Sequence, residues 1–321
     1  MPQVSLPPLS AHSLYLSASA KLRPLLPSLP PPVRDVDVPP LFREPYILSG
    51  YRPPGLPWRC YLLSLFQLHN ETLNVWSHLL AAVCVRWTVP LPCALTYCSA
   101  AAHLLQAHSE LAHYSLFFLD YVGVAIYQYG CALALSVYSA EPAWTLVFLP
   151  AAAILSWLSC TSCCVAKLCF RRPYPLCRKL CQVVPLGVAY LLDVSPLLHP
   201  ARPAGGASGT PPVSSLHQVA LFLLAACFFS CPVPERCSPG RYDVIGHAHQ
   251  LFHLLLALCT LAQQEALFHD FLSRRPALLR RFGEERLLLA CASFPCLALC
   301  SALTALTMRG RARARLKKEQ R

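Results

Sequence analysis

The sequence has few charged residues, and positive charge is missing from a long central stretch. Charged residues make up 13% of the 321 residues, whereas about a quarter is usual in soluble proteins. No lysine or arginine occurs in the 80 residues between Arg86 and Lys167, and the only acids there are Glu110, Asp120 and Glu141. A soluble domain could not keep so long a stretch nearly uncharged. The sequence therefore predicts an all-α membrane protein and excludes ordinary soluble folds and nucleic-acid binding.

Several common functional signals are also missing. The sequence has no Gly-rich phosphate loop, no nucleotide motif and no continuous apolar signal-peptide core before a small-residue cleavage site. Most of the 18 cysteines lie inside apolar runs, where they are expected to pack as small apolar residues rather than form disulfides. Four cysteines lie close together beside basic residues and leave three alternatives open: a thiolate metal cluster, palmitoylation or plain packing. These are Cys160, Cys163, Cys164 and Cys169.

Composition divides the chain into four parts. Residues 1–37 are expected to be a disordered, Pro-rich cytoplasmic head, because residues 1–59 hold 14 of the 31 prolines. We expect residues 38–74 to be a cytoplasmic or interfacial entry segment, residues 75–308 a transmembrane bundle, and residues 309–321 a basic cytoplasmic tail. The bundle contains eight apolar segments, each a predicted span. They cover residues 75–89, 93–107, 114–137, 143–166, 181–198, 216–231, 247–268 and 287–308.

The distribution of positive charge favours a cytoplasmic N-terminus. With eight spans, both termini are cytoplasmic and the cytoplasmic segments hold 20 of the 27 lysines and arginines, as the positive-inside rule requires. The outer loop before the eighth segment breaks this rule, because it contains five arginines from Arg274 to Arg286. Fusing the first two short segments would fit the charges less well.

Four ionisable residues are predicted at one depth near the cytoplasmic side. His103, His249 and His253 are imidazoles and Asp120 is a carboxylate, and His249 and His253 share a helix face. Three imidazoles from two helices have the ligand chemistry of a Zn²⁺ site, with Asp120 as a fourth ligand or holding a water. The alternative is that each is a hydrogen-bonded core residue. His247 should face away from this site, at the interface.

The segment that enters the first span is polar. It contains Asn70 and Asn74, the only asparagines of the chain, with Glu71 between them, and it ends at His78. One interpretation is a capped, interfacial helix start. The other is a polar lid over the site on the cytoplasmic side.

Taken together, these motifs resemble those of the progestin and adipoQ receptor family. The resemblance covers the chain from about Val38 and rests on five motifs, and the eighth segment favours the membrane progestin receptor branch. The motifs are EPYxxxGYRP from Glu44, HNExxNVWxH from His69, SxxxH from Ser99, FFLDYxGV from Phe117 and HQxFH from His249. One departure is clear: residues 86–95 are shorter than in relatives, as a deletion or a truncated gene model would make them.

The resemblance implies a seven-helix bundle with an added C-terminal span and a cytoplasmic N-terminus. It implies zinc held by His103, His249 and His253, and places Ser99 and Asp120 around the bound water. The function it implies is a plasma-membrane receptor for a progesterone-type steroid, surrounded by membrane lipids and signalling through a heterotrimeric G protein. Gln182 is a candidate donor to a steroid ketone, or an interfacial residue. The competing hypothesis is an intramembrane, ceramidase-like zinc hydrolase of lipid amides.

Overall fold

The structure, a computed structural model, has helices as its only extended secondary structure in the residues that it describes. These are residues 29–85, 92–139, 142–170, 175–198 and 213–321. Within these ranges the only β pairing is an isolated bridge between Val33 and Tyr51. The helical fold class predicted from the sequence is confirmed. Most of the predicted head, residues 1–28, lies outside the described residues.

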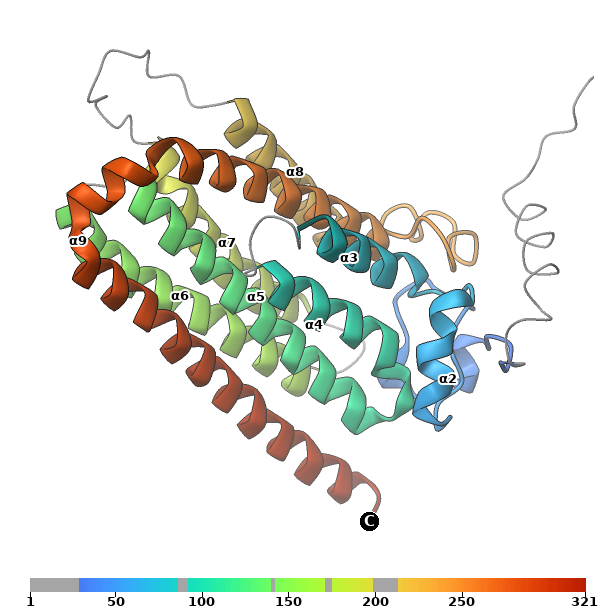
Figure 1. Ribbon diagram of the computed structural model, residues 1–321. Helices are drawn as coiled ribbons and strands as arrows, with labels where there is room; N and C mark the ends of the chain where they lie inside the picture. The colour runs from blue at the N-terminus through green and yellow to red at the C-terminus, as the bar shows by residue number, and fades with distance from the viewer. Residues whose placement is uncertain (1–28, 86–91, 140–141, 171–174, 199–212) are drawn as a thin grey trace, which may run out of the picture.

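Seven long helices make up the bundle (Figure 1). The proline that starts α4 and the proline that starts α6 cost no helical hydrogen bond, because the first N–H groups of a helix have no intrahelical partner. The helices are α3 (Thr72–Val85), α4 (Pro92–Leu105), α5 (Glu110–Ser139), α6 (Pro142–Cys169), α7 (Leu176–Leu198), α8 (Val213–Ser230) and α9 (Ala248–Glu319).

Four helical stretches among the described residues are long and apolar enough to cross a membrane. They are Glu110–Ser136, Val147–Cys169, Ala248–Phe268 and Ala292–Glu319, and Thr72–Cys84 and His217–Ser230 are shorter apolar helices. The two short spans predicted first correspond to α3 and α4, which have 14 residues each. At ~1.5 Å per residue, each is roughly 21 Å long and so shorter than the ~30 Å apolar core of a bilayer. The connection between them, residues 86–91, lies outside the described residues.

Helix α9 contains both the seventh and the eighth predicted segments. It runs for 72 residues without a break, so the prediction of a loop across Arg274 to Arg286 is wrong. Leucine, arginine and glutamate, which are good helix formers, dominate this stretch and explain its helical backbone. Figure 1 shows α9 as two arms joined at a bend, the first near α3 and α8 and the second along α5 and α6.

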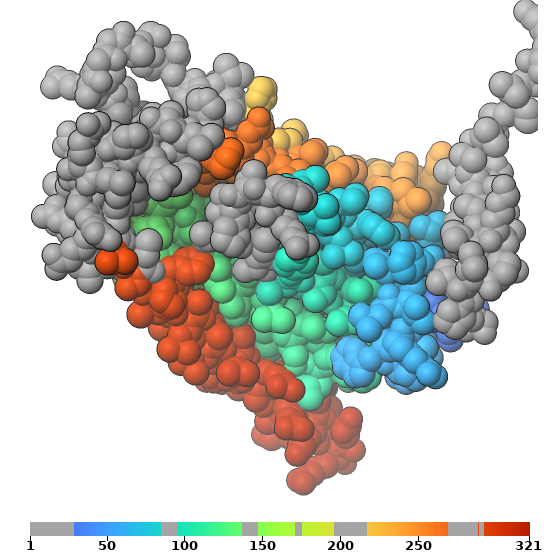
Figure 2. Space-filling model, in the orientation of Figure 1, coloured from blue at the N-terminus to red at the C-terminus, as the bar shows by residue number. Residues whose placement is uncertain are grey.

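The C-terminal arm of α9 is attached to the bundle by small and apolar side chains. Met308 and Ala312 pack with Phe118 of α5 and Cys164 of α6, and Leu316 lies against the same cluster. Figure 2 shows the end of this arm projecting from the body of the molecule.

The entry segment folds as a small unit at one end of the bundle. It contains η1 (Asp35–Asp37), η2 (Pro40–Phe42), α2 (Trp58–Leu63) and η3 (Ser64–Phe66). A core of Val38, Phe42, Ile47 and Tyr51 holds its first half together. The loop between α8 and α9 is connected to this unit, because the Asp243 carboxylate accepts hydrogen bonds from Leu48 N at 3.0 Å and Ser49 Oγ at 2.7 Å.

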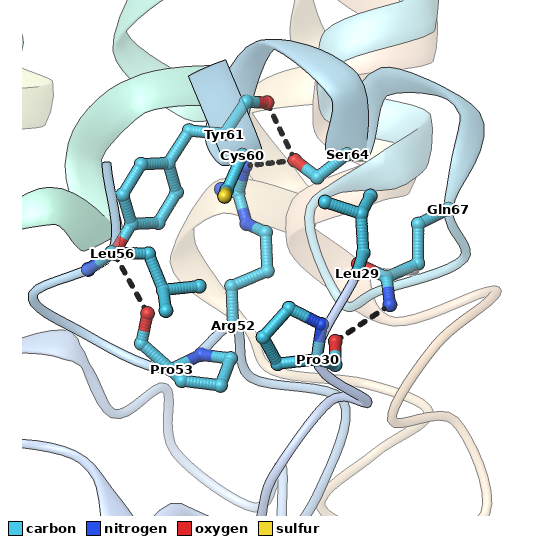
Figure 3. Close-up of a pocket in the computed structure, with 9 residues that line it drawn as sticks. All are labelled: Leu29, Pro30, Arg52, Pro53, Leu56, Cys60, Tyr61, Ser64 and Gln67. Carbon is cyan, nitrogen blue, oxygen red and sulfur yellow. Dashed lines mark hydrogen bonds between the residues drawn. The ribbon is translucent and has the colours of Figure 1, made fainter. Parts of the chain in front are cut away.

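Arg52 connects the entry segment to the end of α4. Its buried guanidinium donates to the carbonyl oxygens of His103, at 2.6 Å, and Leu104, and to Ser64 Oγ at 3.0 Å. Burial lowers the pKa of Arg52 to about 10, so the side chain stays charged at neutral pH. A cation is favourable there because the last carbonyls of a helix carry partial negative charge. Figure 3 shows Arg52 in a pocket lined also by Pro30, Tyr61, Ser64 and Gln67.

We therefore expect Arg52→Ala to destabilise the protein. Removing the guanidinium leaves two buried carbonyls at the end of α4 without their donor, at a cost on the order of 3 kcal/mol. Thermal unfolding in detergent measures the effect, and Arg59→Ala, which removes an exposed arginine of α2, is the matched control. Equal melting temperatures for the two variants would contradict this role of Arg52.

Candidate metal centre

Three histidines predicted from the sequence come together at one end of the bundle. His103 lies near the end of α4, and His249 and His253 lie in the first two turns of α9. One ring nitrogen from each lies within 4.8 Å of the others. The Nε2 atoms of His249 and His253 are 3.1 Å apart. His103 and His253 are buried and His249 is half-buried, so the group is largely shielded from its surroundings.

Two of these imidazoles have their Nδ1 atom engaged by a neighbouring side chain. Glu71 Oε2 lies 2.7 Å from His103 Nδ1, and His78 Nε2 lies 2.6 Å from His253 Nδ1. The Nε2 atom of each of these two rings is thus the one left to bind a metal ion. Neither Glu71 nor His78 was predicted as part of the site.

The carboxylate of Glu71 is surrounded by donors. Besides His103, it accepts hydrogen bonds from Asn74 Nδ2 and from Gln106 Nε2. All of these side chains are buried, so the carboxylate is removed from water but fully hydrogen-bonded. The polar entry motif therefore contacts the histidine group directly.

The backbone of Asn70 holds the start of α9 beside Glu71. Its carbonyl lies 3.0 Å from His247 Nε2 and accepts a hydrogen bond from Gln250 Nε2 at 2.9 Å. His247 is buried at this contact, so the sequence-based placement of His247 at the interface is wrong. Gly50 allows the close approach, because a Cβ at Gly50 would lie 3.2 Å from Asn70 N.

The other residues predicted for functional sites lie outside the group of three histidines. Asp120 of α5 is buried and is hydrogen-bonded by Ser99 of α4, but it is not a member of the group of close ligand atoms. Its Oδ1 atom has no hydrogen-bond partner within the described chain. Gln182 is buried in α7. Cys160 and Cys164 pack in the core, and no thiol cluster with metal-binding geometry occurs in the described parts of the chain.

The three imidazoles fit a Zn²⁺ ion. Zinc takes imidazole nitrogen ligands at ~2.0–2.1 Å, so two nitrogens of a tetrahedral site lie roughly 3.3 Å apart, close to the separation of the two α9 imidazoles. The hydrogen bonds of Glu71 and His78 are of the kind that orients metal-binding histidines. The site could therefore hold a metal ion through three ligands from two helices and leave one position open.

Comparison with known proteins identifies the family of the chain. Residues 88–264 match the model of a family described as haemolysin-III related, which covers α4 to the first part of α9.

Individual relatives match most of the chain. The chain is 49% identical over 323 residues to membrane progestin receptor beta of Homo sapiens, with 92% of the chain and 91% of that protein covered. It is 47% identical to membrane progestin receptor alpha of Homo sapiens, over 81% of the chain and 87% of that protein. The corresponding alpha receptor of Cynoscion nebulosus is 46% identical, over 92% of both.

These matches confirm both the membrane location of the chain and the family indicated by its motifs. The chain belongs to the progestin and adipoQ receptor family of haemolysin-III-related membrane proteins.

Proposed function

We propose that this protein is a plasma-membrane receptor for a progesterone-type steroid and contains an intramembrane zinc site. The observation that carries the proposal is 49% identity to a membrane progestin receptor over nearly the whole chain. Residues on the entry segment, α3, α4 and α9 lie in that covered length and make up the histidine group and its hydrogen bonds.

The chemistry of the ligand suits a helical bundle. A progestin is a rigid apolar body with ketones at its ends, so it needs an apolar site with one or two hydrogen-bond donors. We assign Gln182 of α7 as one donor, because its amide is buried and a ketone oxygen accepts from an amide N–H.

Zinc in this proposal cross-links the bundle where its polar ends meet. His103 comes from α4 and His249 and His253 come from α9, while Asp120 with Ser99 lies beside them on α5 and α4. Losing the ion would loosen the ends of these helices and so weaken steroid binding without any contact between metal and steroid. Chelators should therefore lower steroid affinity indirectly, by loosening the ends of these helices.

The proposal predicts different effects for two kinds of variant. His253→Ala and Asp120→Ala should lower steroid affinity and also lower the zinc content, whereas Gln182→Ala should weaken binding about tenfold and leave zinc in place. Radiolabelled progesterone binding and metal analysis of the same purified samples measure both quantities.

The variants need comparison at equal surface expression. Full steroid affinity in a zinc-free His253→Ala protein would show that metal and ligand sites are independent. Unchanged affinity in Gln182→Ala would remove that residue from the ligand site.

We further propose that the receptor crosses the membrane eight times, with both termini cytoplasmic, and couples to a heterotrimeric G protein. The basic tail supports this orientation, because Arg309 to Arg321, at the C-terminal end of α9, contains seven lysines and arginines. A cytoplasmic basic helix is also available to an intracellular partner.

Epitope tags placed before Met1 and after Arg321 test the orientation. Both tags should stain only after cells are permeabilised, because positive termini stay on the cytoplasmic side. Staining of the C-terminal tag on intact cells would show that the number of spans is odd.

A zinc-dependent hydrolase of lipid amides is the second candidate function. The observation in its favour is the group of three imidazoles with the hydrogen-bonded Ser99 and Asp120 nearby, because three ligands would leave the fourth position of a zinc ion open. Zinc in such a site supplies a water molecule of lowered pKa for attack on an amide. Ceramide hydrolysis that disappears on chelation would favour this function, and its absence in zinc-loaded protein would exclude it.

A further inference from the structure

Two separate hydrogen bonds connect the histidine group to neighbouring side chains. One joins His103 to the carboxylate of Glu71, and the other joins His253 to the imidazole of His78. Both partners are almost fully buried, with 6% of Glu71 and 1% of His78 exposed. Glu71 lies just before α3, and His78 lies midway along α3.

Metal binding fixes the direction of both hydrogen bonds. A ligand imidazole gives the lone pair of one nitrogen to the metal, so its single proton stays on the other nitrogen. With Nε2 toward the ion, Nδ1 of His103 donates to Glu71, and Nδ1 of His253 donates to Nε2 of His78. The proton of His78 then lies on its own Nδ1. Each ring is thus held in the tautomer that binds metal.

We propose that Glu71 and His78 are positioning residues that set the tautomer and orientation of His103 and His253 for zinc. The inference rests on the zinc site proposed above and adds two residues to it. Replacing a residue that hydrogen-bonds a metal-binding histidine typically lowers metal affinity by about tenfold to 100-fold.

The surroundings of Glu71 explain why a carboxylate stands there. Its two oxygens face three donors, from His103, Asn74 and Gln106. A glutamine can still accept from His103 through Oε1, because its NH₂ can donate to the Gln106 carbonyl oxygen once that amide turns. The Oε1 atom of Gln106 is buried and has no other partner in the described chain, which makes this turn favourable. Glu71→Gln should therefore retain part of the zinc affinity that Glu71→Ala loses.

At His78 the position of the accepting atom distinguishes two amides. A glutamine side chain reaches about as far as Nε2 of histidine, whereas an asparagine stops near Nδ1. His78→Gln can therefore accept from His253, and His78→Asn cannot. Ser77→Ala is the matched control, because Ser77 neighbours His78 on α3 but its hydroxyl donates to the carbonyl of Asn74.

Zinc affinity of the purified full-length protein tests the proposal, measured by competition with a chelating indicator. We expect Glu71→Ala, His78→Ala and His78→Asn to bind zinc about tenfold to 100-fold more weakly, and the two glutamine variants and Ser77→Ala to lie closer to the parent. The visible absorption of bound Co²⁺ should shift in the weakened variants, whereas the metal-free melting temperatures of the two glutamine variants and Ser77→Ala should stay close to that of the parent.

Three results would overturn the proposal in distinguishable ways. Parent-like affinity in both alanine variants would show that neither residue positions a ligand. Equal loss for glutamine and asparagine at His78, together with a lower metal-free melting temperature, would assign His78 to packing alone. A parent protein that binds no zinc would instead refute the zinc site of the proposed function.

Discussion

The buried carboxylate of Glu71 is the interaction on which the end of the bundle depends. A charge removed from water is tolerated only if its hydrogen bonds are made within the protein, and Glu71 makes them with side chains of α3 and of the region where α4 ends. Those bonds fix the position of His103 relative to the entry segment. The end of α4, which carries His103, is therefore positioned by a residue that lies just before α3.

The entry segment extends this control to α9 and to the end of α4. The Asn70 carbonyl contacts His247 and Gln250 at the start of α9. Arg52 donates hydrogen bonds to the last carbonyls of α4. Asp243 ties the preceding loop to the same unit. A receptor with this arrangement could transmit a change at the membrane-embedded site to its entry segment, because the same short stretch holds both helix ends.

The sequence predicts much of this centre but not all of it. His103, His249 and His253 were predicted together because buried ionisable residues are costly in a membrane and fell at one depth. Glu71 and His78 were left out because their partners are distant in sequence, and only folding brings α3 against α4 and α9. The continuity of α9 was missed because a cluster of arginines between two apolar runs was interpreted as a loop, although arginine is also a good helix former.

X-ray absorption at the zinc edge of the purified protein tests the central claim most directly. Three imidazoles and one oxygen ligand predict a single shell of nitrogen and oxygen atoms at ~2.0–2.1 Å, with the scattering pattern of imidazole rings. A sulfur shell at ~2.3 Å would place the metal on cysteines, and the absence of a zinc edge would show that the histidine group holds no zinc. Either result would contradict this account of the metal centre.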